Sequence, residues 1–424
     1  MSENEQSVAQ NAILVGIAES TSELDSVSRS LDELTRLLET AGGYAFARAI
    51  QVKDKPDART YIGRGKVAEI AEIAKNNDVR LVIFDVELTP SQIQNLEDDI
   101  GVVTVIDRTM LILDIFALHA GSGEGKLQVE LAQLRYTAPR LTGKGNMLSR
   151  LGGGIGTRGP GESQLERDRR HMKQRIHALE EQLAEMEKNR SVMRAARDRS
   201  GIPKVAIVGY TNAGKSTLLN YLTNAGVLAE NKLFATLDPT TRRLELPEGE
   251  SVLLTDTVGF IRKLPHHLVK AFKSTLDEAA QADILVIAAD ATDSECDEHL
   301  AVTLNLLDEL GASGKPTVLV YNKCDLENAR PRLEYRDMAA VVACSAVTGE
   351  GVDKLLHELL RIVRSGKRER KLLFPYSAQS KVSALYGMAK VIETSYEDDG
   401  ILVRAILDEQ AAGMYRAYLK EENE

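Results

Sequence analysis

The stretch Lys204 to Leu219, KVAIVGYTNAGKSTLL, decides the fold of this 424-residue chain. An apolar, β-branched run breaks at Gly209 into a G-x-x-x-x-G-K-S loop that ends at Ser216, and a helix-like apolar pattern follows. In such a loop successive backbone N–H groups face one phosphate, and the helix N-terminus adds its partial positive charge. We therefore expect a strand, a phosphate-binding loop and a helix. Lys215 would reach the β- and γ-phosphates of a nucleotide, and Ser216 would offer its hydroxyl to Mg²⁺.

Length and composition narrow the class of protein. The chain is too long for one hydrophobic core and fits about two to four domains. No apolar run approaches the roughly 20 residues of a membrane-spanning helix, and the start MSENEQSVAQ is polar and acidic, unlike a signal sequence. The three cysteines stand far apart without a C-x-x-C pair, which predicts reduced thiols and no zinc site. We expect a monomeric cytoplasmic protein.

The first part of the chain, residues 1–110, alternates between strand and helix patterns. Apolar runs at Ala12–Ala18, Tyr44–Val52, Leu81–Asp85 and Gly101–Asp107 are separated by helical periodicity. This alternation predicts a small α/β domain with a largely parallel sheet. The segment Tyr61–Lys66, YIGRGK, lacks the spacing of a nucleotide-binding loop and predicts an ordinary turn.

Long helices are expected over residues 111–200. Two of them, Lys126–Tyr136 and Ser163–Arg199, carry apolar residues at helical seam spacing, which predicts an antiparallel hairpin. Its tip, Arg140–Gly161, contains eight glycines in 22 residues and no acidic residue. Across residues 140–199, 14 basic residues face 8 acidic ones, whereas the whole chain has 53 against 63. We expect this tip to bind RNA through Arg150 and Arg158.

The segment Asn231–Arg242, NKLFATLDPTTR, follows the phosphate loop. It is polar and rich in threonine, as expected of a switch that closes over the γ-phosphate. We expect Thr236 to offer its hydroxyl to Mg²⁺, with Thr240 and Thr241 as alternatives.

A second switch motif, DTVG, ends the next strand pattern. Asp256 would hold Mg²⁺ through water, and the Gly259 N–H would bind the γ-phosphate until hydrolysis removes it.

The N-K-x-D pattern at Asn322–Asp325 selects the base. The Asp325 carboxylate can accept from guanine N1–H and the 2-amino group, whereas adenine offers neither donor there. We expect Asn322 to bond the other edge of the purine, Lys323 to lie along the ring, and the Ala346 N–H to point at O6. The predicted ligands are therefore GTP and GDP.

These motifs give one expected site. Its catalytic residues are Lys215, Thr236 and Gly259, and its Mg²⁺ ligands are Ser216, Thr236 and Asp256. Asn212 could also offer its amide oxygen to K⁺, with a loop-stabilising asparagine as the alternative. The expected nucleotide-binding residues are Gly209, Tyr210, Thr211, Asn212, Ala213, Gly214, Lys215, Ser216, Thr217, Phe234, Ala235, Thr236, Leu237, Asp238, Asp256, Thr257, Val258, Gly259, Asn322, Lys323, Cys324, Asp325, Ser345 and Ala346.

The remaining chain completes the expected architecture. After a GTPase domain over residues 201–366, residues 367–424 begin with a basic KRERK linker and continue as helix, hairpin and a final helix Asp408–Leu419. The expected fold class is α/β: an N-terminal α/β domain with a long helical hairpin, a P-loop (Ras-like) GTPase domain and a small α+β C-terminal domain.

The motifs GYTNAGKS, FATLDPTTR and DTVGFIRKLPHHLV, with LGGGIGTRGPGESQLERDRR upstream, resemble those of the HflX family of ribosome-associated GTPases. The resemblance implies an N-terminal domain that docks on the large ribosomal subunit, near its peptidyl-transferase centre, and a role in splitting or rescuing stalled ribosomes. One departure from the wider Ras-like pattern is Phe260, which stands where many GTPases carry a water-orienting glutamine. Hydrolysis should therefore be slow in isolation.

Three alternatives stay open at the level of sequence. The GTPase could act in ribosome assembly, it could be coupled to a modification enzyme, or the N-terminal domain could carry a second, ATP-dependent activity in an RNA-binding protein. The flanking domains offer no cluster of nucleophiles or metal ligands for a modification enzyme, and no second phosphate loop.

Overall fold

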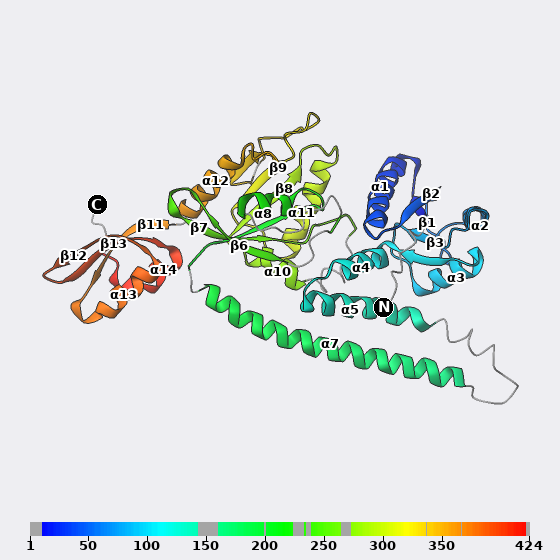
Figure 1. The fold of residues 1–424 in the computed structure, drawn as a ribbon, viewed down its shortest axis with the longest axis horizontal. Coiled ribbons are helices and arrows are strands. Elements are labelled where there is room, and N and C mark those ends of the chain that lie inside the picture. The colour runs from blue at the N-terminus through cyan, green and yellow to red at the C-terminus, as the bar shows by residue number, and fades with distance from the viewer. Residues whose placement is uncertain are drawn as a thin grey trace, which may run out of the picture. The chain divides into compact units, whose positions relative to one another are not determined.

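The computed structural model describes residues 11–142, 160–198, 201–223, 233–234, 239–263, 273–335, 337–365 and 367–420. Within these residues the strands form three sheets, of four, six and three strands (Figure 1). The chain divides into two compact units. The first comprises Met1–Lys188, Leu228–Pro239 and Thr257–Asp277, and the second comprises Asn189–Val227, Thr240–Asp256 and Glu278–Glu424.

The first sheet is parallel throughout, with the strand order β2-β1-β3-β4. Its apolar residues pack with the helices into one core, as the alternation of patterns predicts. The helix after β3 begins at Pro90 with a capping box, in which Thr89 and Gln92 satisfy each other's backbone N–H groups. The elements are β1 (Asn11–Ala18), η1 (Thr21–Glu23), α1 (Leu24–Thr40), β2 (Tyr44–Val52), α2 (Arg64–Asn76), β3 (Leu81–Phe84), α3 (Pro90–Ile100) and β4 (Thr104–Asp107).

Helices follow the first sheet, again as expected. They are α4 (Arg108–His119), α5 (Gly123–Thr137), η2 (Ala138–Thr142) and the 39-residue α7 (Pro160–Asp198). Two ion pairs join α5 to α7, Glu130 with Arg175 at 2.6 Å and Arg135 with Glu180 at 2.6 Å. These contacts place the two helices side by side. The tip residues 143–159, with Arg150 and Arg158, lie outside the described residues.

The second sheet has the strand order β10-β9-β8-β5-β7-β6, and β6 alone of its six strands is antiparallel to its neighbour. The central strands are continuously buried, which explains their unbroken apolar runs. The elements are β5 (Lys204–Gly209), α8 (Lys215–Thr223), β6 (Thr240–Glu245), η3 (Pro247–Gly249), β7 (Ser251–Asp256), α10 (Lys273–Gln281), β8 (Ile284–Asp290), α11 (Cys296–Glu309), β9 (Thr317–Asn322), β10 (Ala340–Ala343) and α12 (Val352–Ser365).

The C-terminal sheet is antiparallel, with the order β11-β13-β12. Two sequence predictions are wrong here. The KRERK run is not a linker but the start of β11, which is the first strand in the order of this sheet. The final helix is also shorter than the expected Asp408–Leu419, because it ends at Met414 and a separate 3-10 turn follows at Arg416–Tyr418. The elements are β11 (Lys367–Phe374), η4 (Tyr376–Ala378), α13 (Gln379–Met388), β12 (Lys390–Glu397), β13 (Gly400–Asp408), α14 (Glu409–Met414) and η5 (Arg416–Tyr418).

Two expectations from composition can be compared with this fold. Over the part of the chain that the structure describes, no helix is long and apolar enough to cross a membrane. The three cysteines are free thiols, and burial raises the pKa of Cys296 and of Cys344 to about 12. Both of these thiols are therefore protonated and unreactive at neutral pH.

Candidate nucleotide-binding site

The phosphate loop joins the end of β5 to the start of α8. Gly209 has a φ of +142°, and a Cβ added there would lie 2.2 Å from the carbonyl oxygen of Ala288 on β8. Gly214 has a φ of +88°, and its Cβ would lie 2.2 Å from Nδ2 of Asn322. Only glycine fits either position, so the two glycines of the motif are explained by close backbone packing. Asn212, with a φ of +62°, is of a residue type that tolerates the left-handed region.

Lys215 is buried at the base of this loop. Its Nζ atom donates a hydrogen bond of 2.8 Å to the carbonyl oxygen of Tyr210. Burial lowers the pKa of Lys215 to about 8, although the charge of Asp256 acts in the opposite direction. The loop therefore holds a cation that lacks a full counter-charge, which suits it to an anionic ligand.

Ser216 and Asp256 meet beside the loop. The Ser216 hydroxyl donates to Oδ2 of Asp256 over 2.6 Å, and Asp256 is fully buried at the end of β7. A hydroxyl and a carboxylate at this spacing form a pair of hard oxygen donors. The buried Thr211 hydroxyl has no hydrogen-bond partner among the described residues.

Asn322 joins two parts of the site through its side-chain amide. Its Nδ2 donates to the Ala213 carbonyl oxygen over 2.9 Å, and its Oδ1 accepts from the Ala346 N–H over 2.9 Å. Asn322 is buried and thus joins the phosphate loop to the Ser345–Ala346 segment. The expected contacts of Asn322 and of the Ala346 N–H with the base stay predictions.

The other base-site residues gather near the end of β9. Lys323 forms a 2.6 Å ion pair with Asp290 at the end of β8, while Asp325 is exposed. The buried Ser345 hydroxyl accepts from the backbone N–H groups of Val347 and Thr348, which fixes the turn that closes this side. Cys324, between the motif residues, donates its thiol to the Tyr321 carbonyl oxygen.

One contact was not predicted from the sequence. The ring of Tyr210, in the phosphate loop, stacks on the ring of His299 of α11, with centroids 3.7 Å apart and an interplanar angle of 11°. His299 is also near two carboxylates, Asp293 at 3.4 Å and Glu295 at 3.9 Å. A lone histidine about 90 residues after the loop carries no local signal of such a contact.

Comparison with known proteins gives the family. Four family profiles match along the chain: "GTP-binding GTPase N-terminal" over residues 28–117, "GTP-binding GTPase Middle Region" over 119–197, "50S ribosome-binding GTPase" over 204–323 and "HflX C-terminal domain" over 333–419. The GTPase HflX of Lacrimispora saccharolytica is 47% identical over 94% of this chain and 93% of its own length. The chain belongs to the HflX family.

A second relative agrees with this membership. The GTPase HflX of Escherichia coli K12 is 42% identical over 89% of each chain. A crystal structure of a GTP-binding protein from Sulfolobus solfataricus in complex with GDP is 27% identical, covers 84% of this chain and 99% of that one, and has a TM-score of 0.45. The HflX-family chain is a GTPase.

The switch residues of this HflX-family GTPase are only partly described. Ala235, Thr236, Leu237 and Asp238 lie outside the described residues. Phe234 packs edge-on against Phe116, with ring centroids 4.7 Å apart, and its expected contact with the nucleotide stays a prediction. Thr240 and Thr241, the alternatives to Thr236 as the Mg²⁺ ligand, both lie in β6. The Thr241 hydroxyl makes a 2.9 Å hydrogen bond with the hydroxyl of Thr255 in β7.

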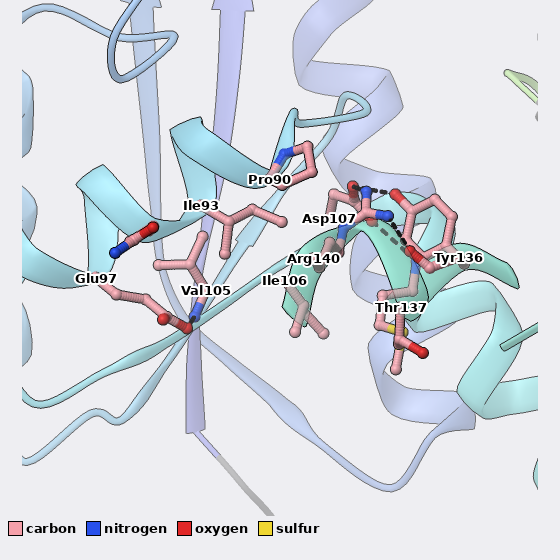
Figure 2. A pocket seen from close by; sticks show the side chains of 11 residues that line it. Pro90, Ile93, Glu97, Val105, Ile106, Asp107, Tyr136, Thr137 and Arg140 are labelled. Carbon is pink, nitrogen blue, oxygen red and sulfur yellow. Dashed lines mark hydrogen bonds and ion pairs between the residues drawn. The ribbon is translucent and has the colours of Figure 1, made fainter. Parts of the chain in front are cut away.

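The N-terminal domain of the HflX-family chain has a pocket of its own. Figure 2 shows this cavity of about 220 Å³, beside β4 and α3. Its polar groups are bonded to one another: Asp107 accepts from Tyr136 and from Arg140, and burial raises the pKa of Tyr136. None of the described residues that line it is a glycine. Arg140, which the sequence placed in the basic tip, is thus anchored to the domain.

Proposed function

We propose that this GTPase is a nucleotide-controlled switch that associates with the large ribosomal subunit and splits or rescues stalled ribosomes. The observation that carries the proposal is that one chain combines a complete guanine-nucleotide motif set with a helical hairpin whose tip is basic and rich in glycine. The match of residues 204–323 to a profile described as "50S ribosome-binding GTPase" supports the same partner.

The proposed domains are 1–110, 111–200, 201–366 and 367–424. The matched ranges 28–117, 119–197, 204–323 and 333–419 support this order. Strand β11 begins at Lys367, which supports the last boundary.

The proposed site uses the phosphate loop for the nucleotide and Asp325 for guanine. Ser216 and Asp256, joined by a 2.6 Å hydrogen bond, have the donor chemistry that Mg²⁺ prefers, and Thr236 is the proposed third ligand. When bound, Mg²⁺ neutralises charge on the β- and γ-phosphates. Lys215 would leave the Tyr210 carbonyl oxygen to bind these phosphates, and the Gly259 N–H would detect the γ-phosphate.

The proposed site has no glutamine after Gly259 to orient the attacking water. Phe260 directly follows Gly259, is fully buried and has no hydrogen-bonding atom in its side chain. The attacking water must therefore be oriented by other polar groups, such as the switch backbone, a cation or the ribosome. We expect slow intrinsic turnover that the large subunit accelerates.

Asn212 is proposed as a K⁺ ligand beside the phosphates. Its φ of +62° equally suits the alternative, an asparagine that only stabilises the loop. Measuring GTP hydrolysis in K⁺ and in Na⁺ decides between them, because the K⁺ proposal requires a faster rate in K⁺ and equal rates support the alternative.

The hairpin tip is the proposed RNA contact. Neutralising both Arg150 and Arg158 should weaken co-sedimentation with large subunits. The slope of log affinity against log salt concentration should become shallower by about one for each lost phosphate contact. Intrinsic GTP hydrolysis should hardly change, since the motif residues are untouched. If a neutral Gly/Ser segment in place of Leu151–Gly161 leaves co-sedimentation and stimulated turnover intact, the tip is only a linker.

A second candidate, an ATP-dependent activity of the N-terminal domain, has less support. The pocket beside β4 is lined mostly by apolar side chains and by polar groups already paired with one another. A phosphate site needs free backbone donors or cations instead.

A further inference from the structure

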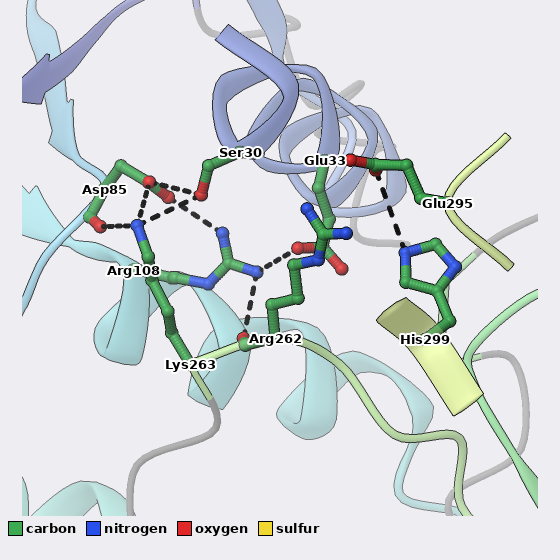
Figure 3. A network of polar contacts seen from close by, with 8 residues as sticks. All are labelled: Ser30, Glu33, Asp85, Arg108, Arg262, Lys263, Glu295 and His299. Atoms are coloured by element: carbon green, nitrogen blue, oxygen red, sulfur yellow. Dashed lines mark hydrogen bonds and ion pairs between the residues drawn. The ribbon is translucent and has the colours of Figure 1, made fainter. Parts of the chain in front are cut away.

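A buried carboxylate of the N-terminal domain binds the segment that follows DTVG. Asp85 lies just after β3 and is almost fully buried. One of its oxygens, Oδ2, accepts from the Ser30 hydroxyl at 2.5 Å and from Nζ of Lys263 at 2.6 Å. The other, Oδ1, accepts from Nη1 of Arg108 at 2.8 Å (Figure 3). Lys263 also donates to the Asp85 carbonyl oxygen at 3.3 Å and to the Ser30 hydroxyl at 3.1 Å.

Arg108 reinforces the same contact. Its side chain is 2% exposed, and its Nη2 donates to Glu33 at 2.6 Å and to the carbonyl oxygen of Arg262 at 3.2 Å. The segment 262–263 is therefore held twice, once through the Lys263 side chain and once through the Arg262 backbone. Ser30, Glu33, Asp85 and Arg108 all belong to the expected N-terminal sheet and its helices.

The chain between Gly259 and Lys263 is short and largely fixed. Phe260 and Ile261 are buried, at 0% and 1% exposure. Lys263 has a φ of +52°, a backbone conformation that is unfavourable for a residue with a Cβ atom. A strained residue persists only where its surroundings hold it, and the bonds to Asp85 supply that hold.

The two cations on Asp85 are not equivalent. Arg108 is buried, whereas the Lys263 side chain is 49% exposed. Removing Lys263 leaves Asp85 bonded to Arg108 and Ser30, so no buried charge loses its last partner. Lys263 can thus be changed without dismantling the core of the domain, which makes its contribution measurable.

We propose that Lys263, held by Asp85, is a positioning residue for Gly259. The anchor fixes the segment four residues after Gly259, so that its N–H can meet the γ-phosphate with little further loss of chain entropy. The inference rests on the proposed role of Gly259 in binding the γ-phosphate.

The test compares affinities for a non-hydrolysable GTP analogue and for GDP in the full chain. Lys263→Met should lower analogue affinity about fivefold, the size expected of a hydrogen bond to a charged group that is half exposed. GDP affinity should change by less than twofold, because GDP has no γ-phosphate. Lys263→Arg should restore analogue binding, since arginine can donate to the same carboxylate.

Two further variants make each result decisive. Lys53→Met removes a surface ion pair of 3.4 Å with Asp57 in the same domain and should leave both affinities unchanged. Gly259→Ala reports on the γ-phosphate contact itself. If Gly259→Ala lowers analogue affinity and Lys263→Met does not, the positioning role is refuted while the assignment of Gly259 stands. If neither variant alters the affinity for the analogue, both are refuted.

Discussion

Replacing Asn322 by alanine should weaken GTP and GDP binding equally and lower the stability of the protein. The side chain is 2% exposed and makes two hydrogen bonds of 2.9 Å, to the Ala213 carbonyl oxygen and from the Ala346 N–H. Alanine leaves both backbone groups buried and unpaired. Each such group costs about 1–3 kcal/mol, so a combined loss of roughly 2–6 kcal/mol is expected.

Nucleotide affinity should follow this loss in part, because the cross-link holds the phosphate loop in shape. If roughly 1.5 kcal/mol of this loss is regained only on binding, both affinities fall about tenfold. Fluorescent GDP and GTP-analogue titrations, with thermal unfolding of the same samples, measure the two effects. Asn328→Ala, which removes an exposed 3.3 Å bond to the Thr292 carbonyl oxygen, is the matched control and should change neither.

A 7-deaza-guanine nucleotide separates this cross-link from the role expected from sequence. If Asn322 bonds N7 of the base, the wild type should prefer GDP to 7-deaza-GDP and the alanine variant should lose that preference. The cross-link predicts the same ratio of affinities in both proteins. Unchanged GDP affinity and unfolding temperature in Asn322→Ala would show that the Asn322 side chain stabilises neither the phosphate loop nor the protein.

Three other predictions concern the same site. Asp325→Asn exchanges an acceptor for a donor and should shift preference from GTP to XTP; unchanged GTP affinity contradicts the base assignment. His299→Ala removes the stack on Tyr210 and should lower GDP affinity about threefold, with recovery in His299→Phe; aromatic pairs contribute about 0.5–1.5 kcal/mol, and equal affinities in all three proteins would exclude this role. The pKa of Lys215 is about 8 when folded and its ordinary value is 10.5, so nucleotide-free wild type should gain stability relative to Lys215→Met as pH rises from about 8 to 10.5. A stability difference that is independent of pH in this range contradicts the burial of a charged lysine.

The parts of the fold that sequence predicts well are those that local pattern determines. Strand β2 coincides with the expected run Tyr44–Val52, and β5, the loop and α8 follow directly from glycine spacing and apolar periodicity. Strand β11 was missed because its first residues are charged, and a charged edge strand looks like a solvated linker until its partner β13 is known.

The candidate site likewise has features that local sequence pattern predicts and features that it does not. Motifs predict which residues gather around the phosphate loop, but they do not give the partners of each side chain. Asn322 bonds Ala213, 109 positions away, and Lys263 bonds Asp85, 178 positions away. Such pairs depend on how the sheets bring loops together, and no local spacing encodes them. Arg140 likewise resembles a tip cation in sequence, yet it is paired with Asp107.

Co-sedimentation of the full chain with isolated large ribosomal subunits tests whether this GTPase is a nucleotide-controlled switch that associates with the large subunit. It compares GDP with a non-hydrolysable GTP analogue, at a fixed salt concentration because such binding depends steeply on salt. We expect the protein to sediment with the large subunit in the presence of the analogue and to stay largely in the supernatant in the presence of GDP. Equal binding in the two nucleotides, or no binding in either, would contradict it.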